Sequence, residues 1–329
     1  MFLLCRRGVR LHNVLIITPL HTQSDWIAMP HNTPAVAVVM STYNGMPYVG
    51  EQVQSVLSQE GVDTHLFVRD DGSADGTVEF LRGLEEKGAL TLFTGGNLGV
   101  VGSFIELLGR VPAEFEWVAL CDQDDVWRPD KLARAVAALS QGPQDVPRLY
   151  CSEYTFCDEQ MNPTGRSHLN LIGVGFSTLL YETKVSGNTT VINRKLCDLA
   201  AAAGAQDVYG HDWWLGLIAA GLGELTFDDY QSLDYRRLAA SVSPTGGSFL
   251  TILRFRVKAY LQGDQLMRIA RQLKRFYDVF GDQLDAEKRA LVERFVHGGR
   301  MKKATAPVRL RQIMTEEVAL RVLFLLGKL

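Results

Sequence analysis

Residues 119–132 read ALCDQDDVWRPDKL, and they join an apolar run to a group of acids. The apolar run is Trp117–Cys121, and Asp122, Asp124 and Asp125 follow it directly. Carboxylates this close repel one another, and each raises the pKa of its neighbours unless a positive charge lies among them. A divalent cation would supply that charge, because Mg²⁺ and Mn²⁺ prefer hard carboxylate oxygens. We therefore predict a metal site with all three acids as ligands.

Two alternative interpretations of these acids are a solvated loop and a calcium loop. In the first, Asp130 would help to cap the next helix, but such a loop has no need to bear the repulsion. A calcium loop of the EF-hand type is excluded, because Val126 and Trp127 stand where an oxygen ligand and a glycine are required.

Upstream of the acids, strand and helix patterns alternate. The residues between the strands are long enough for helical crossovers, which predicts an α/β fold with a Rossmann-like, mostly parallel central sheet and flanking helices. Ligands of such sheets bind at the carboxyl ends of the strands. We expect strands at 36–40, 65–69, 90–93 and 117–121, and helices at 47–59, 75–87, 101–108 and 129–139.

Downstream the alternation loosens, and the chain ends in a basic helical extension. We expect a strand at 148–157, a short helix within 191–203, a helix at 211–220, a strand at 222–227 and a helix at 249–277. The expected division is an N-terminal extension without stable order (1–34), a main domain (35–245) and the C-terminal extension (246–329). The basic residues of the 249–277 helix are Arg254, Arg256, Lys258, Arg268, Arg271, Lys274 and Arg275.

Two further polar clusters follow predicted strands. The first strand ends in Ser41, Thr42, Tyr43 and Asn44, and the second ends in Asp70-Asp71-Gly72-Ser73. Because parallel strands end at one edge, we expect these clusters to meet the acids after Cys121. An aromatic ring, hydroxyls and carboxylates together suit a nucleoside, although a turn with a helix cap explains the second cluster equally well when it is taken alone.

Composition excludes several other classes of protein. The chain has 329 residues, 47% of them apolar and 22% charged, and a formal net charge of −3, so no overall charge favours nucleic acid. Its five cysteines include no Cys-x-x-Cys pair, which favours reduced thiols in a cytoplasmic protein over a disulfide framework or a zinc site. No apolar run is long enough to span a bilayer.

The motifs, taken in order, resemble glycosyltransferase family 2, and most closely its bacterial rhamnosyltransferase-like branch. They are VAVVMSTYNG (36–45), RDDGSADGT (69–77), GGNLGVVGSF (95–104), the 119–132 stretch and YGHDWWLGLIAAG (209–221). The resemblance implies a GT-A fold and inverting transfer of a sugar, such as the deoxyhexose rhamnose, from a dTDP- or UDP-sugar. The acceptor would be a saccharide or a lipid-linked sugar.

The resemblance also assigns roles to residues. Asp212 would be the general base, and Asp124 the first choice as metal ligand, with Asp122 beside it. An acid that accepts the hydroxyl proton is what a single inverting displacement requires in any case. The donor would be bound by Ser41, Thr42, Tyr43, Asn44, Asp70, Asp71, Asn97, Asp122, Gln123, Gly187, Asn188, His211 and Arg236.

Three features of the sequence have alternative interpretations. His211-Asp212 alone also fits a helix N-cap, and the two tryptophans behind it fit packing. Leu238 stands where the branch usually has a histidine. If that histidine helps to bind diphosphate or metal, Arg236 or Arg237 would have to do so in this chain. The alternative function is a catalytically inactive module that binds a nucleotide sugar. A nucleotidyltransferase is disfavoured, because the glycine-rich loop it needs after the first strand is absent.

The basic C-terminal residues have two interpretations. One is an ordinary solvated face. The other is peripheral attachment to the anionic inner face of the cytoplasmic membrane, helped by the apolar stretch 318–329.

Overall fold

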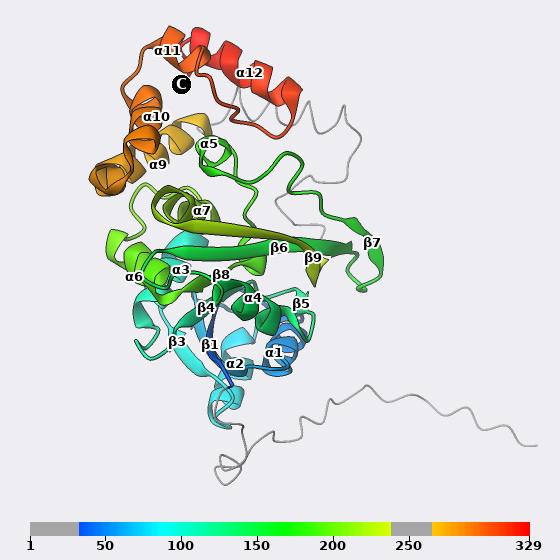
Figure 1. Ribbon diagram of the computed structural model, residues 1–329. Coiled ribbons are helices and arrows are strands. Elements are labelled where there is room, and N and C mark those ends of the chain that lie inside the picture. Colours follow the sequence, from blue (N-terminus) through cyan, green and yellow to red (C-terminus); the bar gives the residue numbers. More distant parts are fainter. Residues whose placement is uncertain (1–32, 238–264) are drawn as a thin grey trace, which may run out of the picture. The chain divides into compact units, whose positions relative to one another are not determined.

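The first half of the sheet is parallel, as expected for continuous apolar strands that are covered on both faces. The computed structural model describes residues 33–237 and 265–329. Strands β1 (Ala35–Thr42), β2 (Asp63–Asp70), β3 (Thr91–Thr94) and β4 (Trp117–Cys121) lie in the order β3-β2-β1-β4. Helices α1 (Val49–Leu57), α2 (Thr77–Glu85) and α3 (Gly99–Arg110) connect them (Figure 1). β1, β2 and β4 therefore end along one edge of the sheet.

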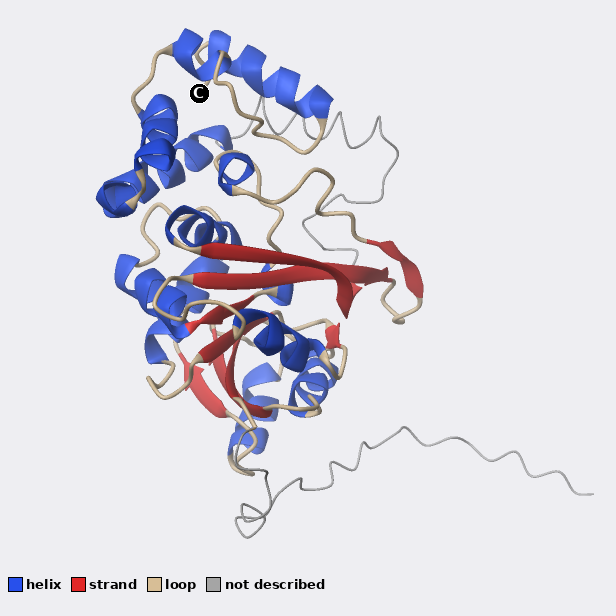
Figure 2. Ribbon diagram, in the orientation of Figure 1, coloured by secondary structure: helices blue, strands red, loops and turns tan. Residues whose placement is uncertain are grey.

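Beyond β4 the sheet becomes mixed. β8 (Val191–Asn193) is antiparallel to β4 and to β6 (Arg148–Cys157), and β9 (Glu224–Arg236) is parallel to β6. The short strands β5 (Val126–Trp127) and β7 (Pro163–Arg166) pair antiparallel with β9 and β6. Figure 2 shows the sheet twisting as it passes from one half to the other.

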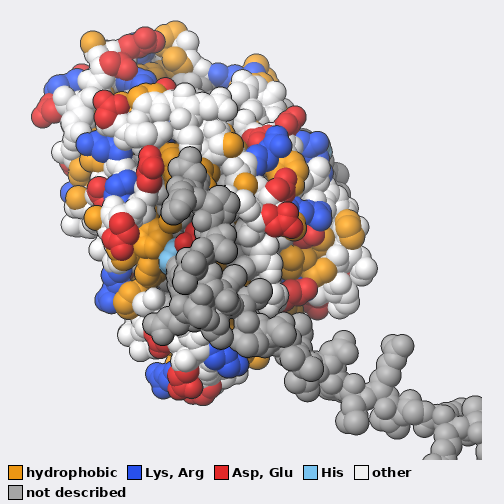
Figure 3. All heavy atoms as spheres, turned by 60° about the horizontal axis from the view of Figure 1, so that its bottom comes forward, with side chains coloured by type: hydrophobic (Ala, Val, Ile, Leu, Met, Phe, Trp, Pro, Cys, Tyr) orange, Lys and Arg blue, Asp and Glu red, His pale blue; other side chains and the backbone are white. Residues whose placement is uncertain are grey.

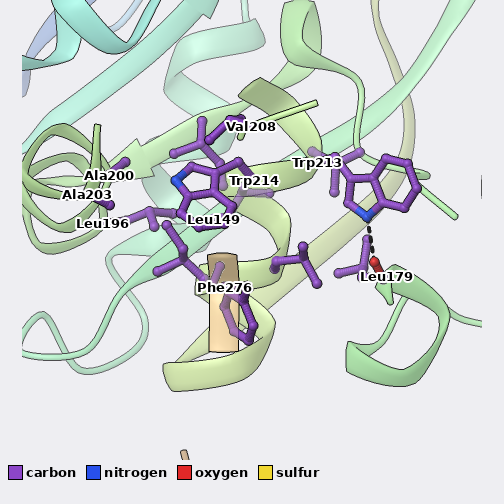
Figure 4. Close-up of a cluster of buried hydrophobic side chains, with 14 of the residues drawn as sticks. Leu149, Leu179, Leu196, Ala200, Ala203, Val208, Trp213, Trp214 and Phe276 are labelled. Carbon is purple, nitrogen blue, oxygen red and sulfur yellow. Dashed lines mark hydrogen bonds between the residues drawn. The ribbon is translucent and has the colours of Figure 1, made fainter. Parts of the chain in front are cut away.

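Two hydrophobic cores cover the two faces of the sheet. One lies under α1, α2 and α4 (Lys131–Leu139). The other lies under α3, α6 (Arg194–Ala203) and α7 (His211–Leu222). Trp214 of α7 is fully buried among Leu149, Leu196 and neighbouring side chains, as Figure 4 shows. This packed interior therefore fixes the positions of β4 and of the N-terminus of α7.

The C-terminal helices share the second core and are part of the same compact unit. They are α9 (Gln265–Phe280), α10 (Ala286–Val296), α11 (Arg300–Ala304) and α12 (Met314–Leu325), with the short 3-10 helix η3 (Gly281–Gln283) between α9 and α10. Two other short helices, α5 (Phe176–Leu179) and η2 (Gly187–Thr189), precede β8. Phe276 and Phe280 of α9 pack on Trp214. Within the described ranges, none of the helices combines the length and apolarity that a membrane span requires.

Most predicted elements are confirmed, with differences at their ends. The strands at 117–121 and 148–157 have the predicted bounds, and the helices begin or end within a few residues of prediction. The strand predicted at 222–227 is a longer strand, β9, and β5, β7 and β8 were not predicted. Several predictions concern residues outside the described ranges. They are the predicted extension 1–34 except for its last two residues, the domain boundary at 246, and Leu238, Arg254, Arg256 and Lys258.

Candidate functional site

Three carboxylates converge where β4 ends and α7 begins. Asp122 follows β4 directly, and the charges of Asp124 and Asp212 act on its carboxyl group. Burial, with these two charges adding to it, raises the pKa of Asp122 to about 7. Burial also raises the pKa of Asp124, against the opposing charge of Arg236. The fold therefore brings the acid that follows β4 within electrostatic reach of the acid in the first turn of α7.

Arg236 lies beside these acids, but its guanidinium is already engaged. It donates to the backbone carbonyls of Asp124 (3.0 Å) and Glu159 (2.7 Å) and forms an ion pair with Glu51. It also stacks on Tyr48, with its central carbon 4.8 Å from the ring centroid. Arg236 thus ties the end of β9 to the acidic loop and partly offsets the charge of Asp124.

Asp125 is turned into the wall of the site. It is 1% exposed, and its carboxylate accepts from the Asn188 side chain (2.6 Å) and from the Arg236 backbone N–H (3.3 Å). Burial and the charges of Asp122 and Asp124 raise its pKa well above the usual range. Both Asp125 oxygens are therefore engaged with the protein, which leaves Asp122 and Asp124 as the candidates for the metal site predicted from the sequence.

Gly187 lies against His211, and this close approach explains the glycine. A methyl group at Gly187 would come within 2.5 Å of the His211 Nε2 atom. The imidazole stacks on Phe104 with centroids 4.2 Å apart, and its Nε2 has no hydrogen-bond partner. Burial lowers the pKa of His211, although the charge of Asp212 opposes this shift. A neutral ring nitrogen therefore faces the backbone beside the predicted base.

The start of α7 places Asp212 at its first turn, with Gly210 as N-cap. The Asp212 carboxylate accepts from the Trp213 backbone N–H at 2.7 Å and is half-buried. Trp213 and Trp214 are both buried, and the Trp213 indole donates to the Leu179 carbonyl (Figure 4). Both tryptophans therefore serve packing, which holds the helix start against the acids of β4.

Gln123 joins the end of β4 to the end of β1. Its side chain accepts from the Tyr43 N–H (2.9 Å) and donates to the Tyr43 carbonyl (3.2 Å). The Tyr43 side chain is 51% exposed, so its ring is free to stack on a planar ligand. Asn44 has a positive φ of 49°, and its side chain accepts from the Ala74 N–H. The two strand ends thus form one continuous polar rim.

The acids of the second cluster stabilise the loops around them. Asp70 is fully buried and accepts from Thr42, from the Ser73 hydroxyl and from the backbone N–H groups of Gly72 and Ser73. Asp71 pairs with Arg69 and accepts from the Leu98 N–H. These contacts support the turn interpretation for Asp70 and Asp71, while a role in binding the base stays a prediction.

Two predicted residues, Ser41 and Asn97, make hydrogen bonds near the start of α3 or within it. Ser41 donates to Ser103 of α3 at 2.9 Å. Asn97 is exposed and accepts from the Gly99 N–H at 2.9 Å, which forms the turn into α3. Ser41 thus joins β1 to α3, and Asn97 shapes the loop between β3 and α3.

Two tyrosines border the acids without having been predicted. The rings of Tyr154 and Tyr235 lie 5.2 Å apart, and the charges of Asp122 and Asp125 add to the burial that raises the pKa of each phenol. They come from β6 and β9, and the sequence contains no signal that these two strands are neighbours. Only the tertiary fold brings them to the site.

The donor set suits a hard dication that shares its ligands with a substrate. In the described ranges, no three His, Cys, Asp or Glu side chains form a preformed metal cage. Mg²⁺ is usually held by one or two carboxylates together with substrate phosphates, so Asp122 and Asp124 fit this mode. Burial raises the pKa of both carboxyl groups, and a dication bound between them would favour their ionised forms.

The chain is similar in sequence to known proteins. Residues 37–178 match the family described as Glycosyl transferase family 2. The chain is 27% identical over 191 residues to the dTDP-rhamnosyl transferase RfbG of Shigella flexneri, an alignment that covers 54% of this chain and 63% of that protein. It is 32% identical over 110 residues to the putative teichuronic acid biosynthesis glycosyltransferase TuaG of Bacillus subtilis, with 33% and 43% covered. The chain thus spans less than two thirds of the length of these relatives.

A solved structure shows the same fold. TarS 1-349 of S. aureus in complex with UDP-GlcNAc has a TM-score of 0.54 and 17% sequence identity, and the match covers 88% of this chain and 87% of that one. This likeness shows a GT-A arrangement of a central sheet between helices, as predicted.

Proposed function

We propose, from the premise that this chain belongs to glycosyl transferase family 2, that it transfers a sugar with inversion from a nucleotide diphosphate donor to an acceptor hydroxyl. One observation carries the proposal: the charges of Asp124, in the same loop, and of Asp212, which is far away in the sequence, both act on the Asp122 carboxyl group at the carboxyl end of β4. A purely structural loop would have no reason to hold three repelling carboxylates together.

Asp212 is the proposed general base. In a single displacement, the acceptor oxygen forms a bond to the anomeric carbon while the bond from that carbon to the diphosphate oxygen breaks. The acceptor proton passes to the Asp212 carboxylate, and the nucleoside diphosphate leaves with the electron pair. The start of α7 is rigid, because Trp213 and Trp214 are buried behind it, so the carboxylate is held in place.

Asp122 and Asp124 are the proposed ligands of Mg²⁺ or Mn²⁺. When bound, the cation would neutralise the negative charge on the leaving diphosphate. Tyr43 is proposed to stack on the base, and Gln123 holds the Tyr43 backbone in position.

The finer specificity is also a proposal. The relative from Shigella flexneri supports a dTDP-deoxyhexose such as dTDP-rhamnose, with a UDP-sugar as the second donor to be tested. We propose a saccharide or lipid-linked sugar as the acceptor and a role in polysaccharide biosynthesis. The described cysteines are free and buried, which agrees with the predicted cytoplasmic location. On the face in Figure 3, Lys and Arg side chains are interspersed with Asp and Glu, which offers no support for nucleic-acid binding.

The test is release of nucleoside diphosphate from a panel of dTDP-, UDP- and GDP-sugars, with Mg²⁺, Mn²⁺ or a chelator. We expect one donor to be turned over in a metal-dependent way. Asp212→Asn should bind that donor with little change and lose turnover by roughly 100-fold or more, the usual contribution of a general base.

Asp198→Asn is the matched control, because this acid is exposed on α6 in an ion pair with Arg194. It should leave both binding and turnover unchanged. Metal-dependent donor binding without turnover for any acceptor would instead establish the inactive binding module. An unchanged rate in Asp212→Asn would refute the assignment of the base.

A further inference from the structure

Helix α12 has apolar side chains on two faces: Leu320 and Phe324 are buried in the second core, and a further set of apolar side chains faces solvent. The exposed residues lie on one face, at positions three to four apart, with exposed fractions between 47% and 61%. They are Met314, Val318, Val322, Leu325 and Leu326. A surface helix ordinarily has polar or charged side chains on the face that is turned to solvent. We refer to these five residues as the α12 stripe.

The charged residues of α12 hold the helix on the protein. Glu317 accepts from the Leu310 and Arg311 N–H groups, each at 2.8 Å, and from the Arg321 Nε at 2.7 Å. Arg321 also donates to the carbonyls of Lys303, Ala304 and Ala306. Because these bonds fix the inner face, the outer apolar face has no role in the described fold.

The apolar surface continues from the α12 stripe onto a neighbouring loop. The Gln312 side chain accepts from the Leu171 and Ile172 N–H groups, each at 2.8 Å, and donates to the Gly173 carbonyl. Leu171 is 57% exposed and Ile172 is 48% exposed, while Ile313 beside Gln312 is 39% exposed. The loop and the helix therefore form one extended apolar surface, which on a soluble protein usually marks an interaction site.

The polar side chains around this surface are mainly basic. Arg300, Lys302 and Lys328 are exposed, and Lys303 is partly exposed. The acids of residues 300–329 are Glu316 and Glu317, and they form ion pairs with Arg311 and Arg321. The positive charge is thus local, since the whole chain has a formal net charge of −3.

We propose that the α12 stripe, with Leu171 and Ile172, lies in the surface of an anionic lipid bilayer. An apolar face buried at the level of the headgroups with basic residues around it is the arrangement that such surfaces bind. A second copy of the chain fits less well, because a two-fold contact through this face would bring the two basic rims together.

The same surface lies a short length of chain from the candidate site. The Ser167 hydroxyl accepts from the Tyr154 N–H at 2.8 Å, and the Tyr154 ring borders the acids. Leu171 is four positions after Ser167, a span of no more than about 14 Å when the chain is fully extended. If the proposed function is correct, attachment here would bring the site to an acceptor anchored in lipid. The binding itself does not depend on that function.

The experiment is flotation of the full chain with vesicles of phosphatidylcholine, or of an equal mixture with phosphatidylglycerol. We expect binding to the anionic vesicles. The double variant Val318→Gln, Val322→Gln should bind these vesicles at least roughly tenfold more weakly, because the substitutions remove apolar area and keep the helix propensity. Lys302→Gln with Lys328→Gln should lose most of the preference for anionic vesicles. The control is Met267→Gln, since Met267 is 57% exposed on α9, away from the stripe.

Three results would overturn the proposal. The first is no binding of the wild-type chain to either vesicle, and the second is equal binding by all variants. The third is a wild-type dimer, measured by light scattering, that the valine double variant converts to a monomer. Release of nucleoside diphosphate from a soluble donor is measured in parallel, so that failure of the proposed function is recorded separately from failure to bind lipid.

Discussion

Asp122 offers a direct measurement of the electrostatics of the site. Its carboxyl group has an ordinary pKa of 3.8 that the fold raises to about 7, first through burial and then through Asp124 and Asp212. Each unit of displacement corresponds to about 1.4 kcal/mol, so ionised Asp122 costs the folded protein up to about 4 kcal/mol. Asparagine cannot ionise, and Asp122→Asn should therefore stabilise the protein where the wild-type carboxyl is charged.

The sign of the pH dependence follows from the direction of the shift. Between the unfolded pKa of 3.8 and the folded value of about 7, the folded state holds a proton that the unfolded state has released. The stability of the wild type therefore falls as pH rises through this range. The advantage of Asp122→Asn should be close to zero near pH 4, grow by about 1.4 kcal/mol per pH unit and level off above about pH 7.

The assay is urea unfolding of both proteins, free of metal, at several pH values between about 4 and 8. Asp198→Asn serves as the control, because its carboxylate is exposed on α6 and should give a difference that is independent of pH. A difference between Asp122→Asn and wild type that does not change with pH would refute the convergence of the three carboxylates. Added Mn²⁺ with a nucleoside diphosphate should stabilise the wild type more than the variant at high pH.

Three other substitutions test neighbouring contacts. Lys131 is buried, its amine has no hydrogen-bond partner, and burial lowers its pKa to about 7. Lys131→Met should therefore raise the free energy of unfolding by up to about 5 kcal/mol below pH 7, where the wild-type amine is charged in the folded state. The gain should become smaller as the pH approaches 10. Gly187→Ala should destabilise by about 1–3 kcal/mol, because its methyl group meets His211, whereas Gly83→Ala, with open space around it in α2, should stabilise by up to about 1 kcal/mol in the same thermal scans. Gln123→Ala should raise the KM for the donor several-fold and change kcat less, since it removes both hydrogen bonds to the rim of the base pocket.

The parallel half of the fold could be predicted because its strands carry their own signal. Val36–Met40 and Trp117–Cys121 are continuous apolar runs, and helices of suitable length separate them. The antiparallel half gave weaker signals. β8 and β5 have three and two residues, too short for any periodicity, and β7 is exposed along its whole length. Only long-range pairing with β4, β6 and β9 makes these segments strands.

The site shows the same division between what is local and what is tertiary. The sequence shows which acids follow a strand. It does not show which of their carboxylate oxygens are left without a hydrogen bond from the protein. Asp70 and Asp125 stand in motifs as acidic as that of Asp122, yet backbone and side-chain donors occupy their oxygens, and this depends on loops far away in the chain. A carboxylate that the fold satisfies adds stability, while one that it leaves charged and desolvated costs stability. Burial makes the ionised forms of both Asp122 and Asp125 costly, but Asp125 has protein donors on its oxygens, whereas a ligand could offset the cost at Asp122. The hydrogen bonds of Asp70 and Asp125 hold the loops around the site, and this difference is why we propose Asp122 and Asp124, rather than Asp70 or Asp125, as the ligands of a cation.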